Sequence, residues 1–146
     1  MKRMATVLLL SCHAWLAQAA DSAPAVTVDP LLAQGRSHIA KKDWPAAAGV
    51  LETFVKGNPK SADGFNLLGY SYRHLKKYDE SFAAYRQALT LDPKHRGAHE
   101  YIGIAYVQTG QLDKAREHLA SLDKLCPFSC EEYRDLKKAV EQAAKP

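Results

Sequence analysis

The sequence lacks a second long apolar run, a marked excess of charge and the short motifs of common enzyme families. After the N-terminal segment, no run of apolar residues is long enough to cross a membrane. Lys and Arg exceed Asp and Glu by only four, 20 against 16, too few for the basic stripe of a nucleic-acid-binding protein. No P-loop, G-x-S-x-G or H-E-x-x-H motif is present. We therefore expect no catalysis, no cofactor, no nucleic-acid partner and no integral membrane segment in the mature chain.

Residues 1–19 have the pattern of a secretory signal peptide. Lys2 and Arg3 precede an apolar run, and the small residues Ala17 and Ala19 follow at the spacing that a signal peptidase requires. This pattern predicts cleavage after Ala19 and export to the periplasm. Residues 20–28 are short, small or polar and without helical period, so we expect them to form a flexible leader.

The signal segment also has a loose similarity to a bacterial lipobox, in the residues Leu9 to Cys12. Acylation of Cys12 would make the mature protein a lipid-anchored assembly factor of the envelope instead of a freely exported one. Cleavage before Cys12 would leave an unusually short signal, so the sequence favours cleavage after Ala19.

The rest of the chain contains seven segments with helical periodicity and no convincing strand. A capping Asp followed by Pro marks a helix start at Asp29-Pro30, and Asn58-Pro59 marks a helix end. The expected helices cover residues 30–41, 44–56, 61–75, 78–91, 95–109, 111–125 and 130–144.

Glycine and proline recur at an interval of 34 residues, a known length for a helix–turn–helix repeat. A glycine in the first helix of each pair allows the second helix to approach closely, and a proline follows the end of the second helix. The final segment, 130–146, has one apolar stripe beneath many charges, as a capping helix requires. The recurring residues are Gly35, Gly69 and Gly103, and Pro59, Pro93 and Pro127.

These features resemble the tetratricopeptide repeat family. The units are 28–61, 62–95 and 96–129, of which the first is the most degenerate. The resemblance implies an all-α, right-handed α-solenoid of three helix pairs plus a C-terminal capping helix, and it is nearest to the small exported bacterial members. Besides the recurring Gly and Pro residues, the positions that carry it include Leu68 and Tyr72 in the middle unit and Tyr106 in the third.

The resemblance further implies a non-catalytic scaffold or adapter in the bacterial cell envelope, which binds another protein or peptide on its concave helix surface. Aromatic, Arg and amide side chains suit a peptide groove, although the same residues could form a plain solvated helix face. Members that grip a chaperone's C-terminal carboxylate use a cluster of Lys and Asn, of which Asn66 alone is present, so that ligand is not predicted. The inward positions are Arg36, Asn66, Tyr70, Arg73, Glu100, Tyr101, Ile104 and Gln108, with Arg134 and Lys138 extending the rim.

Cys126 and Cys130 are the two cysteines that would remain after signal cleavage. An even number in an exported chain, with a turn between them, favours a structural disulfide that fixes the cap against the stack. The alternative is a Cu(I)-handling or redox pair, although the spacing is not C-x-x-C. His95 and His99 are one helical turn apart and could chelate a metal, but a surface role is favoured and no metal site is predicted.

Overall fold

The computed structural model describes residues 29–145, and all regular elements in this range are α-helices. All seven predicted helices are present, and no boundary differs from its prediction by more than one residue. The helices are α1 (Pro30–Ala40), α2 (Trp44–Gly57), α3 (Ala62–His74), α4 (Tyr78–Leu91), α5 (Arg96–Gln108), α6 (Leu112–Leu125) and α7 (Glu131–Ala143). The predicted signal peptide and leader lie outside the described residues.

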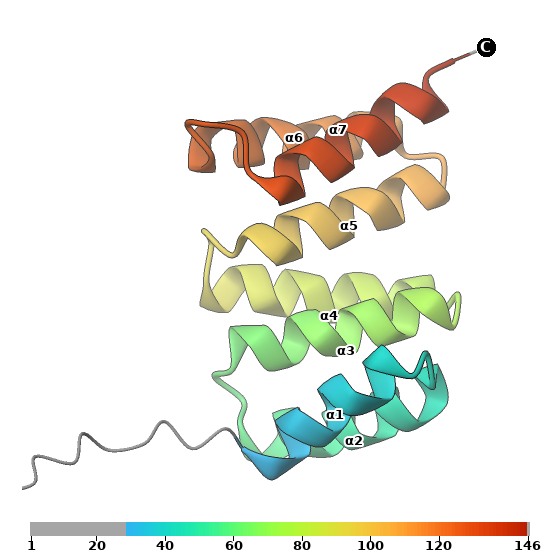
Figure 1. Ribbon diagram of the computed structural model, residues 1–146, viewed down its shortest axis with the longest axis vertical. Coiled ribbons are helices and arrows are strands. Elements are labelled where there is room, and N and C mark those ends of the chain that lie inside the picture. Colours follow the sequence, from blue (N-terminus) through green and yellow to red (C-terminus); the bar gives the residue numbers. More distant parts are fainter. Residues whose placement is uncertain (1–28, 146) are drawn as a thin grey trace, which may run out of the picture.

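The helices form a stack of antiparallel pairs along the long axis of the molecule (Figure 1). Helices α1, α3, α5 and α7 are consecutive neighbours on one side, and we call the surface that they form the odd-helix face. Helices α2, α4 and α6 lie behind them. This is the predicted all-α solenoid with a final capping helix. No helix within residues 29–145 has the length and apolarity needed to span a membrane.

The turn inside each pair repeats a left-handed backbone conformation. The residues concerned are Lys42, Lys76 and Gly110, with φ of 57°, 59° and 74°, and they are spaced by the repeat length. Each follows the C-terminus of the first helix of its pair, where such a residue ends a helix. The prediction of Gly110 as the turn residue is therefore correct, while the two lysines occupy the same strained position without a glycine's freedom.

The recurring glycines let a large side chain lie against the helix backbone. A Cβ at Gly35 would lie 2.7 Å from Leu51 of α2, and one at Gly69 would lie 2.7 Å from Tyr85 of α4. The prediction of close approach within each pair is thus correct for the first two pairs. It is wrong for Gly103, where the side chain in the way is Leu136 of α7, because the capping helix packs directly on α5.

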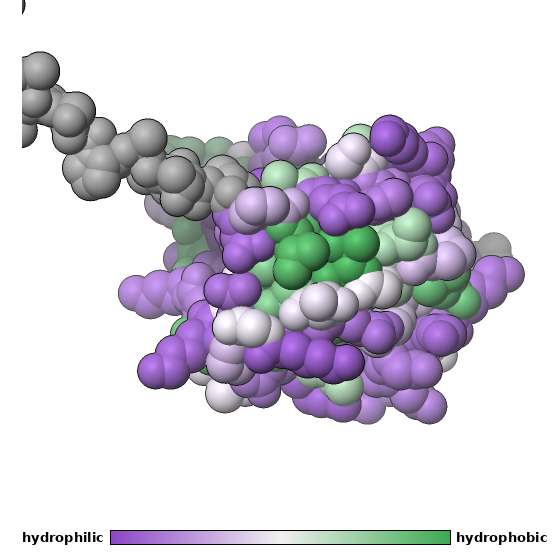
Figure 2. Space-filling model, turned by 90° about the horizontal axis from the view of Figure 1, so that it is seen from below, coloured by the Kyte–Doolittle hydropathy of each residue, from purple (hydrophilic) through white to green (hydrophobic). Residues whose placement is uncertain are grey.

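The two ends of the stack differ. At the C-terminal end, α7 buries Leu136 and Val140 against α5 and α6 and exposes its charges. At the N-terminal end, Figure 2 shows an apolar patch over α1 and α2, framed by hydrophilic residues. The partly exposed apolar side chains of these two helices include Leu31, Leu32 and Val50.

Candidate functional site

A row of aromatic rings crosses the odd-helix face near the middle of the stack. The Tyr70 ring of α3 lies 4.8 Å from Tyr101 of α5 and 4.5 Å from His74, measured between ring centroids. His74 in turn stacks on Trp44, at the start of α2, with a centroid distance of 4.0 Å and nearly parallel planes. We call Trp44, His74, Tyr70 and Tyr101 the aromatic row. It provides a rigid, partly exposed apolar surface about three helices wide.

Two buried polar side chains lie beside the aromatic row, and each has an atom without a hydrogen-bond partner. Asn66 is 6% exposed and Arg73 is 8% exposed, and within residues 29–145 neither Asn66 Oδ1 nor Arg73 Nε has a hydrogen-bond partner. The Arg73 guanidinium carbon lies 5.1 Å from the centre of the Tyr70 ring. Buried polar atoms normally have hydrogen-bond partners, and a buried donor or acceptor without one costs about 1–3 kcal/mol of stability. These two side chains therefore lie under the edge of the aromatic row and form a polar, nearly buried support for it.

A pocket of about 230 Å³ lies at one end of the aromatic row, between α5 and α7. Glu100 in this pocket is only 9% exposed. The pKa of Glu100 is raised to about 7, first by burial and then by the carboxylates of Asp135 and Glu132, whereas Arg73 acts to lower it. Burial and next the Glu100 charge raise the pKa of Tyr101 to about 12. The lining residues are Glu100, Tyr101, Glu131, Glu132 and Asp135.

The other predicted inward residues have different environments. Arg36 is exposed and lies 3.6 Å from Asp63, which also contacts His95 at 2.9 Å, so these groups link α1, α3 and the start of α5. Ile104 packs against the apolar cluster of α6 and α7 and thereby contributes to the core. Gln108 is exposed at the end of α5. The solvated-face alternative does not hold for Asn66, Arg73 and Glu100, which are all buried.

The sequence reasoning missed part of this face. Trp44 and His74 were not among the predicted contacts, although His74 is one helical turn after Tyr70 and so shares its side of α3. For α7, the predicted rim residue Arg134 instead donates from Nη1 to the carbonyl of Ser129 in its own loop. The α7 residues that line the pocket are acidic, because Glu132 and Asp135 lie on the side of the helix that packs on α5.

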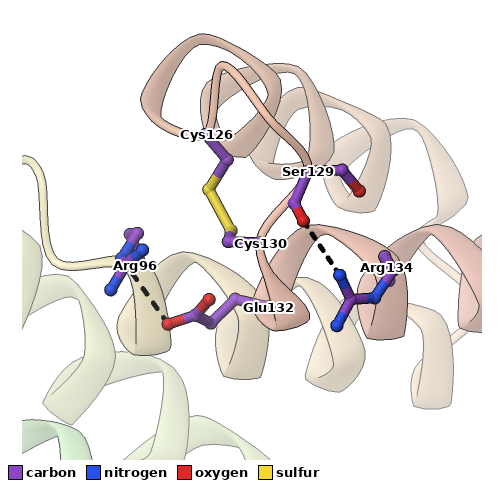
Figure 3. Close-up of a disulfide and its surroundings, with 6 residues drawn as sticks. All are labelled: Arg96, Cys126, Ser129, Cys130, Glu132 and Arg134. Carbon is purple, nitrogen blue, oxygen red and sulfur yellow. Dashed lines mark hydrogen bonds and ion pairs between the residues drawn. A yellow bond between two sulfur atoms is a disulfide. The ribbon is translucent and has the colours of Figure 1, made fainter.

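The loop between α6 and α7 places Cys126 and Cys130 side by side, with Sγ atoms 2.05 Å apart and Cα atoms 5.4 Å apart (Figure 3). This geometry is that of a disulfide bond. Glu132 is near the two sulfur atoms, and its carboxylate lies 3.5 Å from the Arg96 guanidinium. Two bonded sulfur atoms cannot also act as thiolate ligands, so this arrangement suits a structural link more than a Cu(I) site.

His95 and His99, at the start of α5, have structural contacts instead of the predicted surface role. His95 caps α5 by accepting a hydrogen bond from the Ala98 amide. His99 is buried and contacts His118 of α6, with 3.0 Å between their Nδ1 atoms. Burial, and next the neighbouring His99, lower the pKa of His118 to about 4. His95 and His99 have separate partners, so the two rings do not form a chelating pair.

Two family models match the chain, and both are described as tetratricopeptide repeat. One matches residues 32–96 and the other residues 72–140, so together they cover nearly all of the helical stack. A curated relative, tetratricopeptide repeat protein 30 homolog of Drosophila pseudoobscura pseudoobscura, is 27% identical over 95 residues. That match covers 56% of this chain and only 14% of the relative's length.

Solved structures with the same fold include complexes and a chaperone. The TPR2B domain:pHsp70 complex of yeast Sti1 has a TM-score of 0.73 at 20% identity, covering 78% of this chain and 93% of that one. The first TPR of Spaghetti (RPAP3) bound to the HSP90 peptide SRMEEVD has a TM-score of 0.70 at 18% identity, covering 79% and 91%. The type III secretion translocator chaperone SycD of Yersinia enterocolitica has a TM-score of 0.71 at 16% identity, covering 77% and 80%.

Proposed function

Because this chain belongs to the tetratricopeptide repeat family, we propose that it is a non-catalytic module that binds a peptide segment of another protein along its odd-helix face. The observation that carries this proposal is the partly exposed aromatic row, with the polar side chains of Asn66 and Arg73 beside it. Aromatic rings supply contact area at low entropic cost, and buried amide and guanidinium groups can bond a peptide backbone.

Structural neighbours support the peptide mode of binding but not one particular ligand. The first TPR of RPAP3 is bound to a peptide, SRMEEVD, three of whose last four residues are acidic. The odd-helix face here has only Asn66 from the Lys and Asn cluster that grips such a carboxylate, and its pocket is lined by carboxylates. A like-charged ligand would be repelled there. We therefore propose that this chain binds a peptide as the RPAP3 domain does, but that its peptide is not acidic.

A peptide selection tests this function directly. Random nonapeptides displayed on phage are selected on the immobilised protein and, in parallel, on the Tyr70→Ala/Tyr101→Ala double variant. We expect wild-type protein to enrich a set of related sequences that the double variant does not retain, with unchanged helicity by circular dichroism. Phe128→Ala is the matched control, because Phe128 is an aromatic residue that is 97% exposed in the α6–α7 loop. Failure to enrich any sequence on wild-type protein would refute the proposal.

We further propose that the protein acts in the bacterial cell envelope. The support is the signal-like N-terminal pattern, with Lys2, Arg3 and the Ala17-x-Ala19 site, together with a Cys126–Cys130 pair at bonding distance. Sequencing the mature N-terminus of the protein expressed in a Gram-negative host tests this. Ala20 is the expected first residue. An acylated Cys12 would indicate the lipid-anchored form, and an uncleaved chain would exclude export through this signal.

A further inference from the structure

We propose that the acidic pocket between α5 and α7 receives a lysine or arginine side chain of the bound peptide. This inference rests on the proposed function, because the basic side chain belongs to the peptide that lies along the aromatic row. The inference specifies the chemistry of one residue of the ligand: a peptide that binds must carry Lys or Arg at the position that faces the pocket.

Glu100 is the feature of the pocket that points to a ligand. Its side chain lines the pocket from α5 and is more than nine-tenths buried, and no hydrogen bond to another residue in 29–145 compensates it. A buried carboxylate is costly unless it is paired. Arg73 is near enough to act on its charge, but the Coulombic effects of three other carboxylates oppose that of Arg73. An incoming cation would offset the desolvation cost of the ionised Glu100 carboxylate and its repulsion by the neighbouring carboxylates.

The other carboxylates belong to the first turns of α7. Glu131 and Glu132 are favoured there by the positive end of the helix, so their presence alone needs no ligand. Glu132 is also partly neutralised by Arg96 at 3.5 Å, as Figure 3 shows. Asp135 lies one turn further along and has no such compensation within the described chain, yet it too lines the pocket. Asp135 therefore leaves the pocket with an excess of negative charge, to which Glu100 adds once it ionises above its raised pKa of about 7.

The spacing of these carboxylates favours an organic cation over a bare metal ion. A metal needs several ligand atoms that converge on one point. Within residues 29–145, the one set of at least three such atoms lying within 4.8 Å of one another is that of Cys126, Cys130 and Glu132, and it does not include Glu100 or Asp135. An ammonium or guanidinium group, with several N–H donors pointing in different directions, can satisfy carboxylates that lie apart.

The size of the pocket and its aromatic wall fit the stem of a basic side chain. A volume of about 230 Å³ is below the range of about 300–1,000 Å³ that is typical of small-molecule sites, and it is suitable for one long side chain. Tyr101 contributes to the wall and is also the end of the aromatic row. The methylene groups of Lys or Arg can pack on this ring, with the cation near its face. The row and the pocket are thus continuous.

The peptides selected on the wild-type protein provide the test. We expect a Lys or Arg to be enriched at one fixed position, next to apolar or aromatic residues. By titration calorimetry at pH 8, replacing that basic residue with norleucine should weaken binding by about tenfold or more, and Glu100→Gln should do the same. Asp135→Asn should have a smaller effect of the same sign. Glu117→Gln is the matched control, since Glu117 is exposed on α6 and outside the pocket.

The outcomes separate the two proposals. Enriched peptides without a fixed basic residue, or peptides whose affinity is unchanged by Glu100→Gln, would overturn the assignment of the pocket while leaving the peptide-binding function in place. Enrichment of Asp or Glu in place of the expected Lys or Arg would overturn the assignment of the pocket most directly. If no peptide is enriched at all, the proposed function fails, and the inference about the pocket fails with it.

Discussion

Replacing Glu100 with Gln should make the protein more stable at alkaline pH, although it is expected to weaken ligand binding. The side chain is 9% exposed, and its pKa is raised from the ordinary value of 4.5 to about 7, mainly by burial and then by the neighbouring carboxylates. Gln has nearly the same shape and can occupy the same space. It carries no charge, so it avoids the unfavourable desolvation of the ionised carboxylate.

The size of this effect follows from the pKa values of the folded and unfolded states. Below pH 4.5 the carboxyl group is protonated in both states, and it contributes no electrostatic penalty. As the pH rises toward 7, the unfolded chain loses its proton before the folded protein does, so stability is lost through this interval. Above pH 7 the loss is complete and, after allowance for solvent screening in the open pocket, is on the order of 2 kcal/mol for a pKa raised from 4.5 to about 7.

Urea unfolding followed by circular dichroism at pH 4 and pH 8 measures the effect. We expect the unfolding midpoint of Glu100→Gln to match that of the wild type at pH 4 and to be clearly higher at pH 8, with an unchanged slope. Glu117→Gln, which removes the same charge from an exposed position, should leave the midpoint unchanged at both values. A Glu100→Gln variant that is less stable than the wild type at pH 8 would show that Glu100 has a partner in the folded protein. The reasoning about the pocket would then be wrong.

Three further predictions concern the stack itself. Leu136→Ala should lower the free energy of unfolding by about 3 kcal/mol, because this fully buried side chain covers Gly103, and Gly103→Ala should cost less in that background than in the wild type; additive effects in chemical denaturation would contradict the contact. Lys76→Gly should raise stability by about 0.5–1 kcal/mol, since it relieves a positive φ, whereas no gain in the unfolding midpoint would contradict the strain. The pKa of His118 is lowered to about 4, so the folded state resists protonation and stability should be lost as the pH falls from about 6.5 toward 4, on the order of 2 kcal/mol after allowance for partial exposure. His118→Gln should remove that part of the pH dependence. If the urea unfolding midpoint of this variant still falls between pH 6.5 and pH 4 as it does in the wild type, His118 is not responsible.

The helices and their pairing could be predicted from the sequence because local signals are strong and repeated. Asp29 accepts the hydrogen bond from the Leu31 amide that its position before Pro30 predicts, and the prolines after α2, α4 and α6 lie just beyond the helix ends. An interval of 34 residues places Gly35 and Gly69 against the second helix of each pair. Such features depend on a few neighbouring residues and on the repeat interval, so the amino-acid sequence alone is enough to predict them.

The details of the candidate site depend on which residues meet across different helices, and this is where sequence reasoning was incomplete. Tyr70 and Tyr101 were predicted to face inward, but their contact with each other and the stacking of His74 on Trp44 require the packing of α2, α3 and α5. The charge of the pocket was missed for the same reason. The prediction used Arg134 from α7, whereas the rotation of α7 on α5 turns Asp135 toward Glu100.

Because the two ends of the stack differ, we expect local unfolding to begin at one end of the molecule and not at the other. In a one-dimensional array each layer is held only by its neighbours, so opening begins at the ends. The last layer is held by Leu136 over Gly103 and by the loop that brings Cys126 and Cys130 to bonding distance, while the first layer has an apolar patch that no other residue in 29–145 covers. Amide hydrogens of α1 and α2 should therefore exchange with solvent sooner than those of α5 and α7. Fraying from the N-terminal end would leave the aromatic contact of Tyr70 with Tyr101 and the acidic pocket as the most persistent part of the protein.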